Sequence, residues 1–204
     1  MGSAALNGTL TYSYSDLDPG RAVLRIDLHN TTPAYRGGFL TAFAWNNPGN
    51  RISGVESYTT SDNDFKILGK SSFQNRVKAA PFGRFDMGVA IGKKWEGGGS
   101  PHHGLAPGAS ATFEFVLLGT DLGGINEASF WNELSAPPGD GEGNYAFAAR
   151  FRGFKICGPD SDKVPNDPIQ ILHQPEPSSF VLAGIGAVGL AAFGGWRRWR
   201  RLRK

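Results

Sequence analysis

The side chains best suited to chemistry are few and scattered along the 204-residue sequence. A zinc centre needs several ligands in suitable geometry, yet the adjacent His102 and His103 lie in a Gly- and Pro-rich loop without placed partners. His29 and His173 stand alone, and no Gly-x-Ser-x-Gly motif is present. The one cysteine, Cys157, has no recognisable partner histidine, so we expect it to pack as a small apolar group. These residues predict neither a metal centre nor nucleophilic catalysis.

Acid-rich loops are the second candidate for chemistry. They are Asp62-Asn63-Asp64, Asp140-Gly141-Glu142-Gly143-Asn144 and Asp160-Ser161-Asp162. Such loops can supply the oxygen ligands of calcium, but none matches an EF-hand loop, and Asp, Asn and Gly also favour turns for backbone reasons. A glycosidase needs two carboxylates about 5–10 Å apart in a cleft, and no motif selects a pair among the 18 acidic residues. We expect no enzymatic activity and no cofactor, with calcium as the alternative.

Aromatic side chains offer a third kind of chemistry, stacking on sugar rings. Trp45 and Trp131 fall on a predicted strand and a predicted helix, where core packing is the better interpretation. Trp95 follows Lys93-Lys94 and precedes a Gly-rich loop, so it is the tryptophan expected to be exposed. Trp95 is therefore the candidate glycan contact.

The elements that must position these residues are predicted to be β-strands. Leu24, Ile26 and Leu28 alternate with polar residues, and Phe39, Phe43 and Trp45 are expected to share one face of their strand. The 29 Gly and 13 Pro residues exclude a helical bundle, because both are costly in helix interiors. The predicted strands are 10–14, 24–29, 38–45, 52–58, 65–68, 85–91, 112–117 and 145–156.

This pattern predicts an all-β fold, an antiparallel β-sandwich of immunoglobulin-like or jelly-roll type, with one short helix at 125–134. The sandwich domain is expected to occupy residues 1–158. Residues 159–174 contain Pro165 and Pro168 and few large apolar residues, which is typical of a linker. Residues 175–204 form a separate C-terminal segment.

Charge is distributed unevenly between the body and the C-terminal segment. Residues 1–174 carry 15 Lys and Arg against 17 Asp and Glu, so the body is slightly acidic and a poor candidate for nucleic-acid binding. Residues 197–204 hold six bases and no acid, which accounts for the formal charge of +3. The basic residues are Arg197, Arg198, Arg200, Arg201, Arg203 and Lys204.

Immediately before this cluster, residues 180–196 contain no charged side chain. As a helix this run would extend about 26 Å, close to the thickness of a bilayer core. A buried core helix is the alternative, but the terminal position and the abrupt basic end favour a transmembrane span. The side chains expected in the membrane include Phe180, Val181, Leu182, Ala183, Ile185, Ala187, Leu190, Ala191, Phe193 and Trp196.

Two further patterns bear on this span. Residues 184–189 match the dinucleotide motif GxGxxG, but the chain lacks the acidic residue expected about 20 positions later. Basic residues beside a span tend to remain in the cytoplasm, so the body is expected outside the inner membrane. Export requires an N-terminal signal that residues 1–9 do not show, and we expect that the native N-terminus lies upstream or has been removed.

The residues ahead of the span are Pro175, Glu176 and Pro177. This triplet, the short apolar span and the Arg-rich end together resemble the PEP-CTERM sorting signal of bacteria with exosortase systems and exopolysaccharide production. The resemblance implies that an exosortase processes the chain at the triplet, and that the product reaches the cell envelope or the extracellular space. It favours an exported, non-enzymatic structural or adhesive protein, with an exopolysaccharide-binding module as the alternative and a secreted hydrolase as a weaker one.

Overall fold

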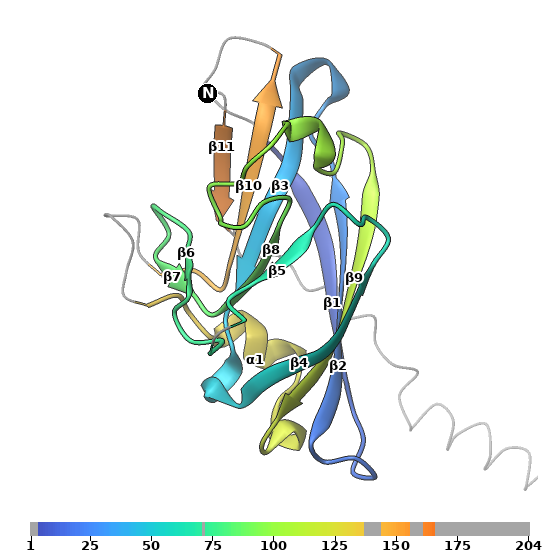
Figure 1. Cartoon of the computed structure of the whole chain (residues 1–204), viewed down its shortest axis with the longest axis vertical. Helices are drawn as coiled ribbons and strands as arrows, with labels where there is room; N and C mark the ends of the chain where they lie inside the picture. The colour runs from blue at the N-terminus through green and yellow to red at the C-terminus, as the bar shows by residue number, and fades with distance from the viewer. Residues whose placement is uncertain (1–3, 71, 137–143, 156–160, 166–204) are drawn as a thin grey trace, which may run out of the picture. The chain divides into compact units, whose positions relative to one another are not determined.

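The computed structural model describes residues 4–70, 72–136, 144–155 and 161–165, and within them most of the regular secondary structure consists of antiparallel strands (Figure 1). Sheet A has the order β1 (Leu6–Tyr14), β2 (Arg21–Asn30), β9 (Ser110–Gly119), β4 (Ile52–Thr60). Sheet B has the order β11 (Ser161–Pro165), β10 (Phe147–Phe154), β3 (Gly37–Trp45), β8 (Met87–Ala90), β5 (Lys66–Leu68).

Short elements lie in the connections between the strands of the two sheets. The strands β6 (Val77–Lys78) and β7 (Arg84–Phe85) form a separate hairpin. The helix α1 (Glu127–Asn132) lies within the predicted range 125–134, and the Asn126 side chain caps it by accepting from the Ser129 backbone N–H. Four 3₁₀ turns complete the described elements: η1 (Ala34–Arg36), η2 (Pro48–Asn50), η3 (Pro101–His103) and η4 (Leu122–Gly124).

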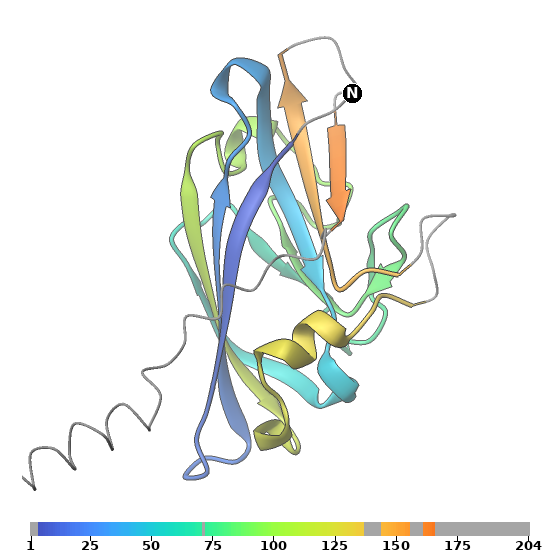
Figure 2. The ribbon, with the colours of Figure 1, turned by 180° about the vertical axis from the view of Figure 1, so that it is seen from behind.

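The main core lies between the sheets, which overlie one another in Figures 1 and 2. The Phe43 ring of β3 meets the Phe113 ring of β9 edge-on at 4.9 Å, and the Trp45 ring of β3 lies 5.2 Å from Phe115 of β9 in a tilted arrangement. Aromatic pairs at such separations stabilise a core beyond the burial of their area. The predicted all-β antiparallel fold is thus confirmed.

The period of two holds along β2 and β9, where every second side chain is buried. The period is interrupted in β3 by a β-bulge. Thr41 is an extra residue there, because Ala42 pairs with Arg150 and Leu40 pairs with the next residue, Phe151. A one-residue bulge reverses which alternate side chains face the core on its two sides. Leu40 therefore enters the main core, while Phe39, expected there from strict alternation, stays half-buried against His102.

Two predicted boundaries also differ from the structure. The predicted strand 85–91 is divided at Asp86 into β7 and β8, which pair with different neighbours. Residues 161–165, within the stretch interpreted as a linker, instead form β11 and pair with β10 from Arg152↔Ser161 to Ala148↔Pro165. Few of these residues are large and apolar, so periodicity alone did not indicate a strand.

A second buried cluster covers the outer face of sheet B. Small residues form its floor: Ala42 and Ala44 of β3, Ala90 of β8 and Ala148 of β10. Trp95, Phe82 and other large side chains from the connections 69–86 and 91–100 lie in the same cluster. Because the floor is made of alanines, these connections approach the sheet closely and bury their own aromatic residues.

Candidate functional site

The whole predicted sorting signal lies outside the described residues. This applies to the triplet Pro175, Glu176 and Pro177, to the predicted span 180–196 and to the basic tail 197–204. Among the residues that the structure does describe, no helix is long and apolar enough to cross a membrane.

The structure corrects the assignment of Trp95 as a glycan contact. Its side chain is only 2% exposed, because it packs onto the alanine floor of sheet B. A buried ring has no free face on which a sugar can stack. Trp45 is fully buried in the main core, as predicted, whereas Trp131 is half-buried and packs at 4.5 Å on Phe147.

The histidines and the acid-rich loops form no metal-binding cluster within the described part of the chain. His103 Nδ1 lies 3.1 Å from Asp64 Oδ2, and both side chains are exposed. His29 Nδ1 lies 2.9 Å from Ser110 Oγ on the outer face of sheet A. His173, Cys157 and residues 140–143 and 160 lie outside the described residues.

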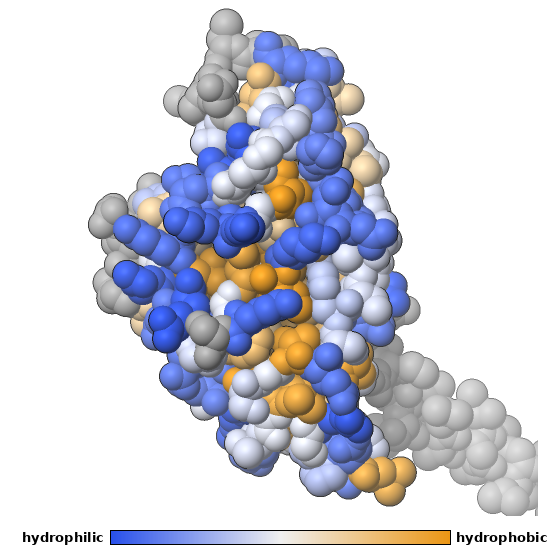
Figure 3. Space-filling view, viewed as in Figure 1, coloured by the Kyte–Doolittle hydropathy of each residue, from blue (hydrophilic) through white to orange (hydrophobic). Residues whose placement is uncertain are grey.

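A shallow groove of about 300 Å³ opens between the edge strands β4 and β5. Residues 53–58 of β4 form one side, and Ile67, Lys70 and Phe73 form the other. Figure 3 shows hydrophobic residues gathered in the middle of this view, with hydrophilic side chains on both sides. The volume is at the lower end for a small-molecule site.

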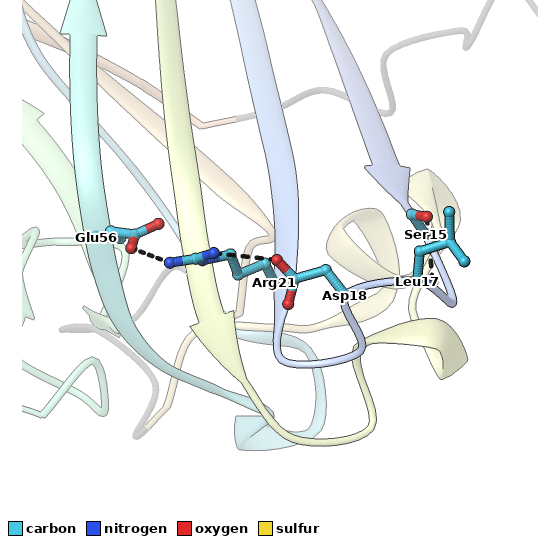
Figure 4. A network of polar contacts seen from close by, with 5 residues as sticks. All are labelled: Ser15, Leu17, Asp18, Arg21 and Glu56. Carbon is cyan, nitrogen blue, oxygen red and sulfur yellow. Dashed lines mark hydrogen bonds and ion pairs between the residues drawn. The ribbon is translucent and has the colours of Figure 1, made fainter.

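Glu56 is the only carboxylate among the residues lining the groove, and it is already paired. Arg21 of β2 reaches across to Glu56 and also donates to Asp18 Oδ2 at 3.1 Å, in the β1–β2 turn (Figure 4). Glu56 first and Asp18 second raise the pKa of Arg21. A lone paired carboxylate cannot supply the acid and base of a glycosidase.

The Tyr58 hydroxyl beside this groove is buried and has no hydrogen-bond partner among the described residues. Its ring stacks on Phe115 at 5.0 Å, and burial raises the pKa of the phenol to about 12. The nearby Thr60 hydroxyl partly opposes this rise in the pKa of Tyr58, but the two hydroxyl groups form no hydrogen bond.

We expect Tyr58→Phe to raise the free energy of unfolding by about 1 kcal/mol, because it removes a buried unsatisfied hydroxyl and keeps the stacked ring. Urea unfolding followed by circular dichroism measures this change. Tyr145→Phe is the matched control, since that ring also packs against a phenylalanine, edge-on against Phe82, and has no buried unpaired hydroxyl. A loss of stability in Tyr58→Phe would contradict the prediction.

Asp86, between β7 and β8, is the most deeply buried carboxylate in the described residues, at 7% exposed. Its two oxygens accept backbone N–H groups from two connections, Asn47 at 2.9 Å and Asn75 at 2.6 Å. Burial raises the pKa of Asp86, and the two hydrogen bonds oppose that rise. Sequence analysis did not single out this residue, because nothing local distinguishes it from the other acids.

Charge is segregated between the two sides of the body. Residues 110–136, from β9 through α1, contain four acids and no base. Residues 66–94, from β5 through the connection over sheet B, contain seven bases and one acid, the buried Asp86. The seven bases are Lys66, Lys70, Arg76, Lys78, Arg84, Lys93 and Lys94.

Strand pairing extends this charge across the outer face of sheet B. The register places Lys66, Ala90, Ala42, Arg150 and Lys163 in one row. We call Lys66, Arg150 and Lys163, together with Arg152, Lys93 and Lys94, the basic face. In the described residues every ion pair involves other bases, namely Arg21, Arg25, Arg51 and His103.

Arg150 and Arg152 lie directly beneath the Gly-rich loop. Gly97 has a φ of 80°, which favours glycine, and a Cβ atom built on it would make a tight contact of 3.2 Å with Nη1 of each guanidinium. Arg150 donates to the Glu96 carbonyl at 2.6 Å and Arg152 to the Gly99 carbonyl at 3.3 Å. Burial, and then the charge of Arg152, lower the pKa of Arg150. The two positive charges are held together by neutral carbonyls.

Comparison with known proteins bears on the C-terminal segment alone. The family model of the PEP-CTERM protein-sorting motif matches residues 175–201. No curated protein and no solved structure matches the chain.

Proposed function

We propose that the body of this chain is a structural or adhesive β-sandwich. The PEP-CTERM motif at its C-terminal end supports sorting by an exosortase to the cell envelope or the extracellular space. The observation that carries the sorting function is the motif match over residues 175–201. The sandwich is supported by two antiparallel sheets that share one core.

In the proposed pathway, residues 180–196 anchor the precursor in the inner membrane, with the basic tail 197–204 in the cytoplasm and the body outside. Exosortase processing at Pro175–Pro177 then removes the anchor. We further propose that the body has no enzymatic activity. The groove beside β4 offers a single carboxylate, Glu56, which is engaged by Arg21.

The alternative role, binding of exopolysaccharide, is weakened by the burial of its candidate residue Trp95. No other described tryptophan replaces it as a platform, because Trp45 is buried and Trp131 packs on Phe147. The structural or adhesive role is therefore preferred, and it predicts that cells lacking the protein lose cohesion or surface attachment.

Replacing Pro175 and Glu176 by alanine is expected to abolish processing. Wild-type and variant chains are produced in a host that contains an exosortase, and intact-mass measurement of the membrane and secreted fractions follows the product. The wild-type protein should lose its C-terminal segment, and the double variant should remain full-length in the membrane. Ser178→Ala with Ser179→Ala is the matched control beside the motif. Equal processing of all three chains would overturn the sorting function.

A further inference from the structure

The residues of the basic face form no ion pair within the described body. Arg150 of β10 lies directly opposite Lys163 of β11, and Arg152 is one step along the same side of β10. Like charges opposite one another on adjacent strands are destabilising. The exposed Lys93 and Lys94 of the connection over the sheet add to the same charge. This arrangement fits a surface that meets an anionic partner.

The path of the chain indicates which partner this is. The described chain leaves the body through β11, the edge strand that carries Lys163 of the basic face. Residues 166–179, 14 in all, separate β11 from the first residue of the expected span. Fully extended, they reach at most about 50 Å. If residues 180–196 insert into the membrane, the end of β11 can therefore lie no farther than this from the membrane surface before processing.

Lipid headgroups supply the complementary chemistry. The exposed lysines Lys66, Lys93 and Lys94 are attracted to an anionic surface within a Debye length. Arg150 and Arg152 add positive charge from beneath the Gly-rich loop. We propose that the basic face docks on the phosphate groups of anionic phospholipids in the membrane that holds the C-terminal segment. This inference rests on the proposed function, because the tether exists only if residues 180–196 insert into that membrane.

The test uses the full chain reconstituted into vesicles. In a Cys157→Ser background, a fluorescence donor is placed at Gly98→Cys, where a side chain meets no atom within 4 Å. A second chain carries the donor at Thr11→Cys, an exposed position of β1 on the opposite sheet. Acceptors on the lipid headgroups report which side of the body faces the membrane. Vesicles contain phosphatidylcholine alone or mixed with phosphatidylglycerol.

We expect stronger energy transfer from position 98 than from position 11 in the vesicles with phosphatidylglycerol. The difference should disappear with phosphatidylcholine alone, and also in about 1 M salt, where the screening length falls to about 3 Å. Changing Lys93, Lys94 and Lys163 to Gln should lower the ratio of docked to undocked body by about 100-fold. The matched control carries the donor at position 98 and has Thr9, Thr11 and Ser13 of β1 changed to Glu. It lowers the net charge by the same amount as the three Lys→Gln changes, but away from the basic face, and should leave docking intact.

Any of three results would overturn the inference. They are equal energy transfer from both positions, energy transfer that does not depend on lipid charge or salt, and docking that persists after the three lysines are replaced. Binding of soluble alginate through these lysines, without docking on anionic vesicles, would overturn it in favour of an acidic polysaccharide. Co-flotation of the full chain with neutral vesicles tests insertion separately. Absence of co-flotation contradicts the proposed function as well, whereas co-flotation without docking contradicts this inference alone.

Discussion

Replacing Trp95 by alanine is expected to lower the free energy of unfolding by about 3–5 kcal/mol, the cost of deleting a large buried aromatic side chain. Trp95 shares a buried cluster with the alanine floor of sheet B, and the floor has no long side chain that could fill the space. The following residue, Glu96, supplies the carbonyl that holds Arg150, so loosening this connection also frees that guanidinium. Urea unfolding of the full chain in detergent measures the loss.

Two controls separate burial from other effects of this change. Trp95→Phe keeps much of the ring and removes an indole N–H that is buried without a partner, so a smaller loss is expected. Lys94→Ala alters the exposed neighbour and should change stability by no more than about 0.5 kcal/mol. If Trp95→Ala proved as stable as the wild type, the ring would not be buried as described, and its role as a glycan contact would have to be reconsidered.

Replacing Asp86 by alanine is expected to cost about 2–4 kcal/mol, because the backbone N–H groups of Asn47 and Asn75 would be left without an acceptor. The loss should also depend on pH. Since burial raises the pKa of Asp86 above its ordinary value of 3.8, the folded state favours the protonated carboxyl. The stabilisation from Asp86 is thus fully present below pH 3.8 and falls as pH rises through the folded pKa.

The measurement is urea unfolding of the wild type and Asp86→Ala at pH 3 and pH 7. The stability difference between them should be larger at the lower pH. Asp86→Asn keeps one acceptor oxygen and carries no charge, so we expect a smaller and less pH-dependent loss. A difference that grows with pH would mean that the two hydrogen bonds, rather than burial, dominate the ionisation of Asp86.

Much of the fold is readable in the sequence where the pattern is local. Alternation in β2 and β9 places their buried residues correctly, because each strand has one face on the main core. The same rule misplaces Phe39, because the bulge at Thr41 depends on the pairing with β10. It also does not distinguish β11, whose few apolar residues pair at the edge of sheet B.

The candidate sites divide in the same way. The sorting motif is contiguous, so residue order alone identifies Pro175–Pro177 and the segments after them. The other features depend on segments far apart in the chain. They are the groove at β4, the hydrogen bonds of Asp86 and the burial of Trp95. A residue between two lysines and a run of glycines is ordinarily exposed, and only the alanine floor beneath it makes Trp95 a buried side chain.

The order of the residues is enough to identify the sorting signal of this protein. An apolar run that follows Pro-Glu-Pro and precedes a basic end can be recognised however the body folds. The order of the residues is also sufficient for the strand content, since periodicity is a local property. The electrostatics of the body required the folded chain. A net charge of −2 over residues 1–174 argues against a basic face, yet strand pairing brings Lys66, Arg150 and Lys163 into one row, because register joins residues that lie almost a hundred positions apart.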